Sequence, residues 1–204
     1  MNLTLARSAK APRRSREDWL EAARMTLIEG GVDKVKVEPL AAVLGVTTGS
    51  FYHHFRRRQD LLDAVLQHWE VENTAPLFRA VHAAGPNPDS QLDALIDAWI
   101  AESDYDPDYD SAVRDWARGS ELAEAAVRRV DDRRVELLKG IFLGFGYDPE
   151  RAFIRARVTY FHQVGQYAMK IVEDPVVRQR QRGLYREILV GDPPLPRAAA
   201  IGEG

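Results

Sequence analysis

Apolar side chains recur at three- and four-residue spacing along most of the chain, and this period constrains the fold more than any other feature. Leu92, Leu95, Ile96 and Trp99 form one such stripe. An amphipathic helix requires this spacing, whereas a half-buried strand requires strict alternation, and no β-branched stretch of the sequence alternates in that way. Glycine and proline clusters, such as the one at 85–88, divide the helical segments. The sequence therefore predicts an all-α protein.

The composition is that of a folded protein, with 45% hydrophobic and 29% charged residues in a chain of 204. No run of about 18 apolar residues occurs, so we expect no transmembrane helix and no membrane partner. Cysteine is absent, which excludes disulfides, thiolate metal sites and cysteine nucleophiles. The absence of cysteine also agrees with a reducing cytoplasm, where we expect the protein to act.

Charge is unevenly distributed along the chain. Residues 1–60 contain 11 Lys and Arg against 7 Asp and Glu, whereas residues 61–204 contain 17 against 24. Binding to a polyanion is therefore expected near the N-terminus. The first 14 residues contain four cations and no acid, and we expect residues 1–14 to form a disordered basic arm.

The segment Val37–Phe55 carries the most specific pattern. Three apolar residues share one face of a short helix that ends at Gly45, and Thr47 or Thr48 begins a second short helix. Phe51 and Phe55 are four residues apart and should point inward, which leaves small and hydrogen-bonding side chains outside. A helix of this kind fits the major groove of DNA, so the segment predicts a helix-turn-helix. The outward side chains are those of Ser50, Tyr52, His53 and His54.

Arg56, Arg57 and Arg58 follow the second helix directly and are placed to neutralise phosphates. Taken alone, two short helices can be an ordinary αα-hairpin, and a run of arginines can be a solvated surface. Together with the basic arm, however, they indicate DNA binding. We expect a helix-turn-helix domain at 15–60, a C-terminal helical domain at 61–190 and a disordered tail at 191–204.

Residues 15–62 resemble the TetR family of transcriptional regulators. The resemblance is carried by Ala22-Ala23, Gly30-Gly31, Leu40-Ala41, Gly45-Val46, Gly49-Ser50-Phe51-Tyr52, Phe55, Arg58 and Leu61-Leu62. It implies that Tyr52 contacts a phosphate, that Arg58 replaces a phosphate-contacting Lys, and that Lys36 replaces a capping Thr. The candidate DNA-binding residues are Lys36, Thr47, Thr48, Gly49, Ser50, Tyr52, His53, His54 and Arg58.

The resemblance further implies a homodimer of all-helical subunits that binds a double-stranded DNA operator and holds a small-molecule effector in its C-terminal bundle. Beyond residue 62 only the architecture is similar, so the identity of the effector does not carry over. The expected function is that of a ligand-responsive regulator, a repressor that releases its operator when the effector binds. A transcriptional activator of the same fold, and a helical small-molecule-binding protein without regulatory DNA binding, are the alternatives.

The C-terminal half offers candidates for the dimer interface and for the effector site. The segment Glu150–Val172 is apolar on two sides, so one side needs a partner beyond the usual core contact. A helix is predicted over 61–82, with a kink at Pro76. Aromatic and polar residues with few charges suggest a pocket for a largely apolar ligand, although they are also typical of a plain aromatic core. The candidate ligand-binding residues are Trp99, Trp116, Phe142, Phe145, Tyr160, His162, Gln163 and Tyr167.

Enzyme signatures are absent from the sequence. It contains no H-E-x-x-H, G-x-S-x-G, Walker loop or G-x-G-x-x-G motif. The acidic segment 104–110 lacks the Gly and the terminal Glu of a calcium loop. We therefore expect no catalytic residues, no cofactor and no metal site.

Overall fold

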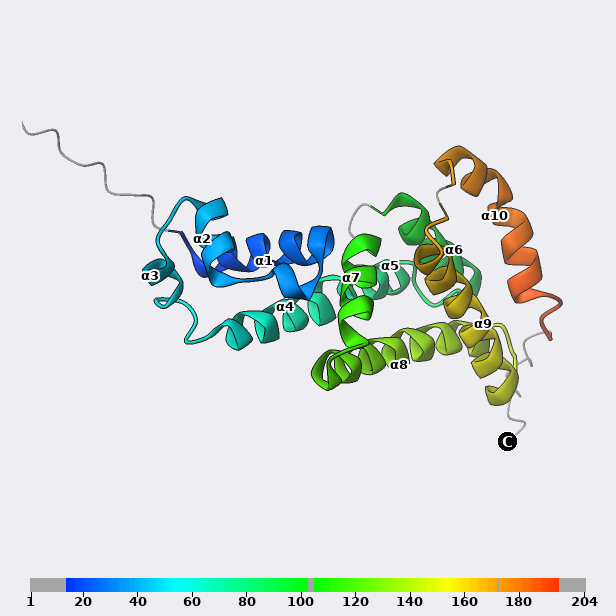
Figure 1. Cartoon of the computed structure of the whole chain (residues 1–204). Coiled ribbons are helices and arrows are strands. Elements are labelled where there is room, and N and C mark those ends of the chain that lie inside the picture. Colours follow the sequence, from blue (N-terminus) through cyan, green and yellow to red (C-terminus); the bar gives the residue numbers. More distant parts are fainter. Residues whose placement is uncertain (1–13, 103–104, 172, 195–204) are drawn as a thin grey trace, which may run out of the picture. The chain divides into compact units, whose positions relative to one another are not determined.

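The computed structural model describes residues 14–102, 105–171 and 173–194. Within these residues the secondary structure consists of ten α-helices and one short 3-10 helix, which confirms the all-α prediction (Figure 1). The chain divides into two compact units, with the boundary between Gln67 and His68. Most of the expected basic arm and tail, Ser103, Asp104 of the acidic segment, and Val172 lie outside the described residues.

The N-terminal unit is built on an aromatic core. It contains α1 (Arg16–Gly30), the 3-10 helix η1 (Val32–Lys34), α2 (Val37–Leu44), α3 (Thr48–Phe51) and the first part of α4 (Arg58–Glu72). A reciprocal capping box between Ser15 and Asp18 starts α1. The rings of Trp19 and Phe51 meet edge to face, with centroids 5.2 Å apart, and both side chains are fully buried. This contact fixes α3 against α1.

The C-terminal unit is a helical bundle around α8. It contains the end of α4, then α5 (Ala75–Ala83), α6 (Pro88–Ala101), α7 (Pro107–Ala117), α8 (Glu121–Gly144), α9 (Pro149–Ala168) and α10 (Pro175–Val190). Helix α8 packs against α6, α7 and α9, while α10 packs against α6 and α9. Within the described residues, no helix is long and apolar enough to cross a membrane.

The helix predicted over 61–82 is in fact two helices. Helix α4 ends at Glu72 and α5 begins at Ala75. Pro76 lies in the first turn of α5, where its missing N–H would have had no helical partner, so it begins a helix instead of kinking one. Asn73 and Thr74 form the break between the two helices, and both are buried.

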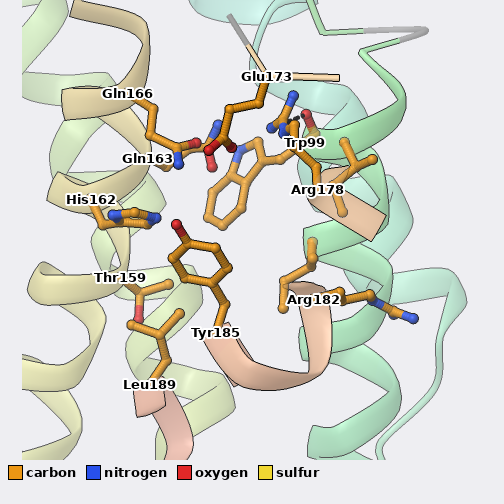
Figure 2. Close-up of a pocket in the computed structure, with 12 residues that line it drawn as sticks. Trp99, Thr159, His162, Gln163, Gln166, Glu173, Arg178, Arg182, Tyr185 and Leu189 are labelled. Carbon is orange, nitrogen blue, oxygen red and sulfur yellow. Dashed lines mark hydrogen bonds between the residues drawn. The ribbon is translucent and has the colours of Figure 1, made fainter. Parts of the chain in front are cut away.

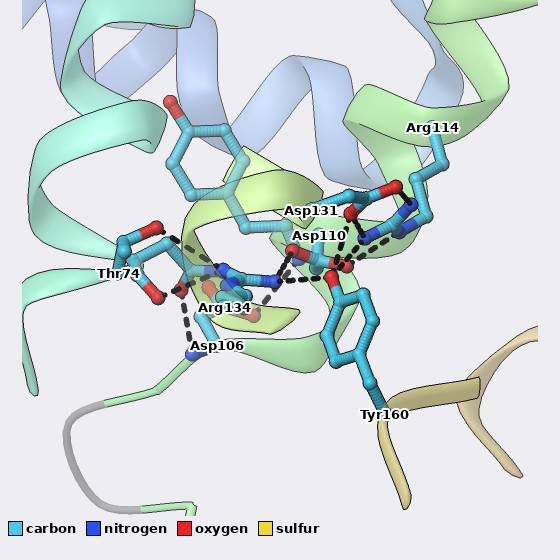
Figure 3. Close-up of polar contacts among 9 residues, drawn as sticks. Thr74, Asp106, Asp110, Arg114, Asp131, Arg134 and Tyr160 are labelled. Carbon is cyan, nitrogen blue, oxygen red and sulfur yellow. Dashed lines mark hydrogen bonds and ion pairs between the residues drawn. The ribbon is translucent and has the colours of Figure 1, made fainter. Parts of the chain in front are cut away.

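A buried ionic cluster joins this break to the bundle (Figure 3). We use this term for Asp110, Arg114, Asp131, Arg134 and Tyr160. Arg134 donates to Asp110 at 2.8 Å and to the carbonyl of Asn73 at 3.1 Å. Arg114 donates to the second carboxylate oxygen of Asp110 at 2.7 Å and to Asp131 at 2.6 Å. The cluster therefore joins α7, α8 and α9 to the α4–α5 break through matched charges.

Candidate nucleic-acid interface and ligand pocket

The turn between α2 and α3 depends on Gly45. Its φ of 68° is left-handed, a conformation that other residues adopt with strain. Gly45 ends α2, and the N–H of Val46 donates to the carbonyl of Ala41 at 3.0 Å, which caps the helix. The sharp turn that results places α3 directly after α2, as a helix-turn-helix requires.

Helix α3 is shorter than predicted. It ends at Phe51, although the N–H of Phe55 still donates to the carbonyl of Phe51 at 3.0 Å, so one further turn follows. Phe51 and Phe55 point inward as predicted, with 0% and 4% of their surface exposed. Their stacked rings, with centroids 5.4 Å apart, support the turn from beneath. The outer side of α3 therefore rests on a rigid aromatic base.

The outer side of this segment presents hydrogen-bonding groups to solvent. Tyr52 is 61% exposed, and Ser50 is half-buried. Thr47 occupies the cap position of α3, but its side chain makes no cap hydrogen bond. The other predicted residues on this side are also exposed, namely Lys36, Thr47, Thr48, Gly49 and His53.

His54 has a different environment from its neighbours. It is half-buried, and its Nε2 lies 2.9 Å from the carbonyl oxygen of Arg14. Arg14 in turn donates from Nε to the carbonyl of Leu44, at the end of α2, at 3.0 Å. The structure thus gives His54 an intramolecular role, because it holds the chain that precedes α1 against the helix-turn-helix.

Arg58 is also engaged inside the unit. Its guanidinium donates to the carbonyls of Val35 and Val32, the latter at 2.6 Å, and the side chain is half-buried. These bonds tie the start of α4 to η1. A phosphate contact by Arg58 would compete with them, so its first role is to hold the unit together. Arg57 pairs with Asp60 at 3.0 Å, whereas its own side chain remains largely exposed.

The C-terminal unit contains a pocket between α6, α9 and α10 (Figure 2). Three of the predicted ligand-binding residues line it, namely Trp99, His162 and Gln163. The remaining walls come from Ile96, Ile100, Thr159, Gln166, Glu173, Arg178, Arg182, Tyr185 and Leu189. Helix α10 contributes four of these side chains, none of which is among the predicted ligand-binding residues.

The other predicted pocket residues are not in its wall. Phe142 and Phe145 belong to the hydrophobic core, with Phe142 fully buried. Tyr160 also packs in this core, and its hydroxyl joins the ionic cluster. Trp116 is buried on α7. Tyr167 packs against the core and donates to Glu102 at 3.2 Å. Aromatic residues were a poor guide here because most of them fill the core.

The cations of the pocket already have anionic partners. Arg178 pairs with Glu102 at 2.9 Å, and Arg182 pairs with Asp93 and Asp97, each at 3.2 Å. Burial lowers the pKa of His162 below 6.5, although the charge of Glu173 acts in the opposite direction. His162 is therefore uncharged at neutral pH. In the part of the chain that the structure describes, no three His, Asp or Glu side chains are grouped as metal ligands.

Helices α9 and α10 also leave an apolar face uncovered. On α9, Val158 and Phe161 are 55% and 52% exposed. On α10, Leu184 and Ile188 are exposed to a still greater extent. Phe153, Ile154 and Val176 extend this surface. We call these seven exposed residues of α9 and α10 the α9–α10 face.

Comparisons with known proteins agree with this geometry. Residues 20–65 match the family described as "Bacterial regulatory proteins, tetR family". A curated relative, the HTH-type transcriptional repressor KstR2 of Rhodococcus jostii, is 28% identical over 89 residues, which are 44% of this chain and 42% of the relative. The match thus spans less than half of the relative's length.

Solved structures match over most of the chain. A TetR-family regulator from Agrobacterium tumefaciens has a TM-score of 0.68 and 19% identity, over 88% of this chain and 97% of that one. The ketosteroid transcriptional regulator KstR2 of Mycobacterium tuberculosis has a TM-score of 0.58 and 18% identity, over 89% of this chain and 97% of that one. At these identities the likeness establishes the fold.

Proposed function

We propose that this chain, whose residues 20–65 match the tetR family of bacterial regulatory proteins, is a ligand-responsive DNA-binding regulator that represses transcription from its operator. The observation that carries the proposal is the row of hydrogen-bonding side chains along the outer side of α3 and the turn that follows it, which rests on the buried rings of Phe51 and Phe55. The chain acts as a regulator and not as an enzyme. Its site of action is the cytoplasm, because its target is DNA.

One group of residues reads the DNA bases, and a second group contacts the phosphates. Ser50 and His53 read base edges from the exposed side of α3 and the following turn. Tyr52 and Lys36 contact phosphates, which position the helix without specifying sequence. Arg58 and His54 act as positioning residues, because their polar atoms bond to the protein's own backbone.

A second copy of the chain covers the α9–α10 face. An exposed apolar surface on two adjacent helices is typical of an interface between subunits. A twofold axis would pair the same two helices of each copy, which makes the surface self-complementary. The resulting dimer presents two copies of α3, as a pseudo-palindromic operator requires.

The effector acts through the dimer interface. Helices α9 and α10 line the pocket on one side and carry the α9–α10 face on another. A ligand that separates them shifts that face, and with it the spacing of the two DNA-binding units. A tenfold loss of operator affinity requires about 1.4 kcal/mol of differential binding between the two conformations. No residue of α4 or α5 is among the described lining residues, so the ligand does not push on these helices directly.

A reporter assay tests the proposed function. A promoter carrying the operator drives the reporter in cells with the wild-type gene, without it, or with a Ser50→Ala, His53→Ala variant. Repression predicts low expression with the wild-type gene and equally high expression in the other two strains. Higher expression with the wild-type gene than without it would identify an activator. Equal expression in all three strains would refute regulation at this site.

A further inference from the structure

One wall of the pocket contains a buried amide with an unused donor. Gln163 is 8% exposed, and none of the described residues accepts a hydrogen bond from its Nε2. Its side chain and the indole of Trp99 both belong to the lining of the pocket (Figure 2). A buried amide N–H group without an acceptor lowers stability, so such groups normally donate to a water or a ligand.

The charged side chains around the pocket do not favour an ionic ligand, because they already have partners or contact water. Arg178 and Arg182 are each paired with carboxylates of α6 or its end. The Nε of Arg182 also lacks an acceptor among the described residues, but this guanidinium is directed to α6 and not to the centre of the pocket (Figure 2). Glu173 is half-buried and keeps contact with water, so it does not require a cation.

The shape of the lining favours a flat apolar body. The rings of Trp99 and Tyr185 face the space between α9 and α10 (Figure 2). The rings of His162 and Tyr185 lie 5.0 Å apart, and Ile96 and Ile100 complete the apolar part of the wall. Stacked and edge-on contacts with such rings are most favourable for planar ligands.

We propose that the pocket binds an uncharged, flat apolar compound that carries a carbonyl-type acceptor, and that Gln163 donates its hydrogen bond to that acceptor. This inference rests on the proposed ligand-responsive function. It identifies the chemical class of the effector and the residue that selects it. Pockets of this kind combine an apolar surface with a few polar groups that fix orientation.

Three related compounds separate the possible ligand classes. Acetylnaphthalene, naphthoate and naphthylethylamine share one flat body but are neutral, anionic and cationic. Calorimetric titration of the purified chain without DNA should show acetylnaphthalene binding about tenfold more tightly than either charged compound. Tighter binding of naphthoate or of naphthylethylamine, or saturable binding of none of the three, would overturn the proposal.

Variants of Gln163 test the donor itself. Gln163→Leu should weaken acetylnaphthalene binding about three- to tenfold, the usual effect of losing one neutral hydrogen bond. Gln163→Met provides a second test if the leucine variant fails to fold. Gln166→Leu, in the same wall but only half-buried, is the matched control and should change binding less than about twofold. Equal effects at Gln163 and Gln166 would refute the assignment of the donor.

The test of the ligand class can fail independently of the test of the proposed regulatory function. Operator binding by the wild-type chain is measured without any of these compounds. If the chain binds an operator but no acetylnaphthalene, only the assignment of the ligand class fails. If it binds acetylnaphthalene through Gln163 but no operator, the ligand class stands and the regulatory function fails.

Discussion

Tyr52 and Arg58 illustrate, at the residue scale, how neighbouring polar side chains take different roles. Tyr52 is largely exposed, whereas Arg58 bonds to two backbone carbonyls of its own unit. Tyr52→Phe should therefore leave folding stability within about 0.5 kcal/mol of wild type and weaken binding to all DNA sequences alike. Thermal unfolding and fluorescence anisotropy with specific and random duplexes measure both effects.

Arg58→Ala should instead destabilise the N-terminal unit by about 1–3 kcal/mol, since it leaves two carbonyls without their donor. Its effect on DNA binding should follow the loss of folded protein. A variant that kept wild-type stability but lowered the salt dependence of binding would show that Arg58 contacts phosphate directly.

Phe142 distinguishes core from pocket in the C-terminal unit. Its side chain is fully buried in the hydrophobic core and is absent from the pocket wall. Phe142→Ala should lower the free energy of unfolding by about 3–5 kcal/mol, because it leaves a cavity that the core cannot fill. Denaturant unfolding monitored by circular dichroism measures the loss. A change below about 1 kcal/mol would contradict the core assignment.

At the scale of helices, the ionic cluster makes stability depend on pH. Burial alone would raise the pKa of Asp110, but the charges of Arg134 and Arg114 outweigh it and hold the pKa below 3.8. A carboxyl whose pKa is lowered on folding stabilises the protein above its unfolded value, and this contribution is lost as pH falls through the folded value. Acid should therefore loosen the joint between α7, α8 and the α4–α5 break.

Asp110→Asn tests this dependence. It should lower the free energy of unfolding by about 3–5 kcal/mol near neutral pH, because Arg134 and Arg114 lose a buried partner. Wild type loses further stability as the pH falls below 3.8, and the variant should lose less of it over this range because it has no carboxyl to protonate at this position. Asp115→Asn, at an exposed ion pair, is the control and should change little. Parallel pH profiles for wild type and Asp110→Asn would exclude Asp110 as the titrating group.

The α9–α10 face predicts the oligomeric state. Wild type should sediment as a dimer at micromolar concentration, with an interface of roughly 2,000 Å² in total. Val158→Asp places a charge at the centre of the exposed apolar stripe and should give a monomer. Leu122→Asp, at an exposed position of α8, should stay dimeric. A dimeric Val158→Asp variant, or a monomeric wild type, would exclude this interface.

Sequence periodicity anticipated the helices better than the sites. The spacing of Phe51 and Phe55 was enough to predict which side of α3 and of the following turn is buried, because a four-residue separation fixes a shared face. The positions of Arg58 and His54 in the sequence could not reveal that their side chains form hydrogen bonds with the backbone of residues far away along the chain. For the same reason, aromatic content could not separate Phe142 in the core from Trp99 in the pocket.

For the whole molecule, the proposed effector site and the proposed dimer interface share two helices. Helices α9 and α10 carry both the pocket lining and the α9–α10 face, whereas the DNA-reading residues belong to the other unit. Under the proposed function, a ligand that separates these two helices therefore weakens DNA binding by changing how the two copies of the chain pair. In wild type, a bound effector should change the sedimentation or scattering of the dimer, and a monomeric variant should lose the response of DNA binding to the effector.

Selection of duplexes from a random pool tests sequence-specific DNA binding most directly. The wild-type chain should enrich a pseudo-palindromic site and bind it at least about a thousandfold more tightly than random DNA at physiological salt. A Ser50→Ala, His53→Ala variant should lose that preference and keep the salt-dependent binding to random DNA. Failure of the wild-type dimer to enrich any sequence, or enrichment of the same site by the variant, would contradict DNA reading by α3 and the turn that follows it.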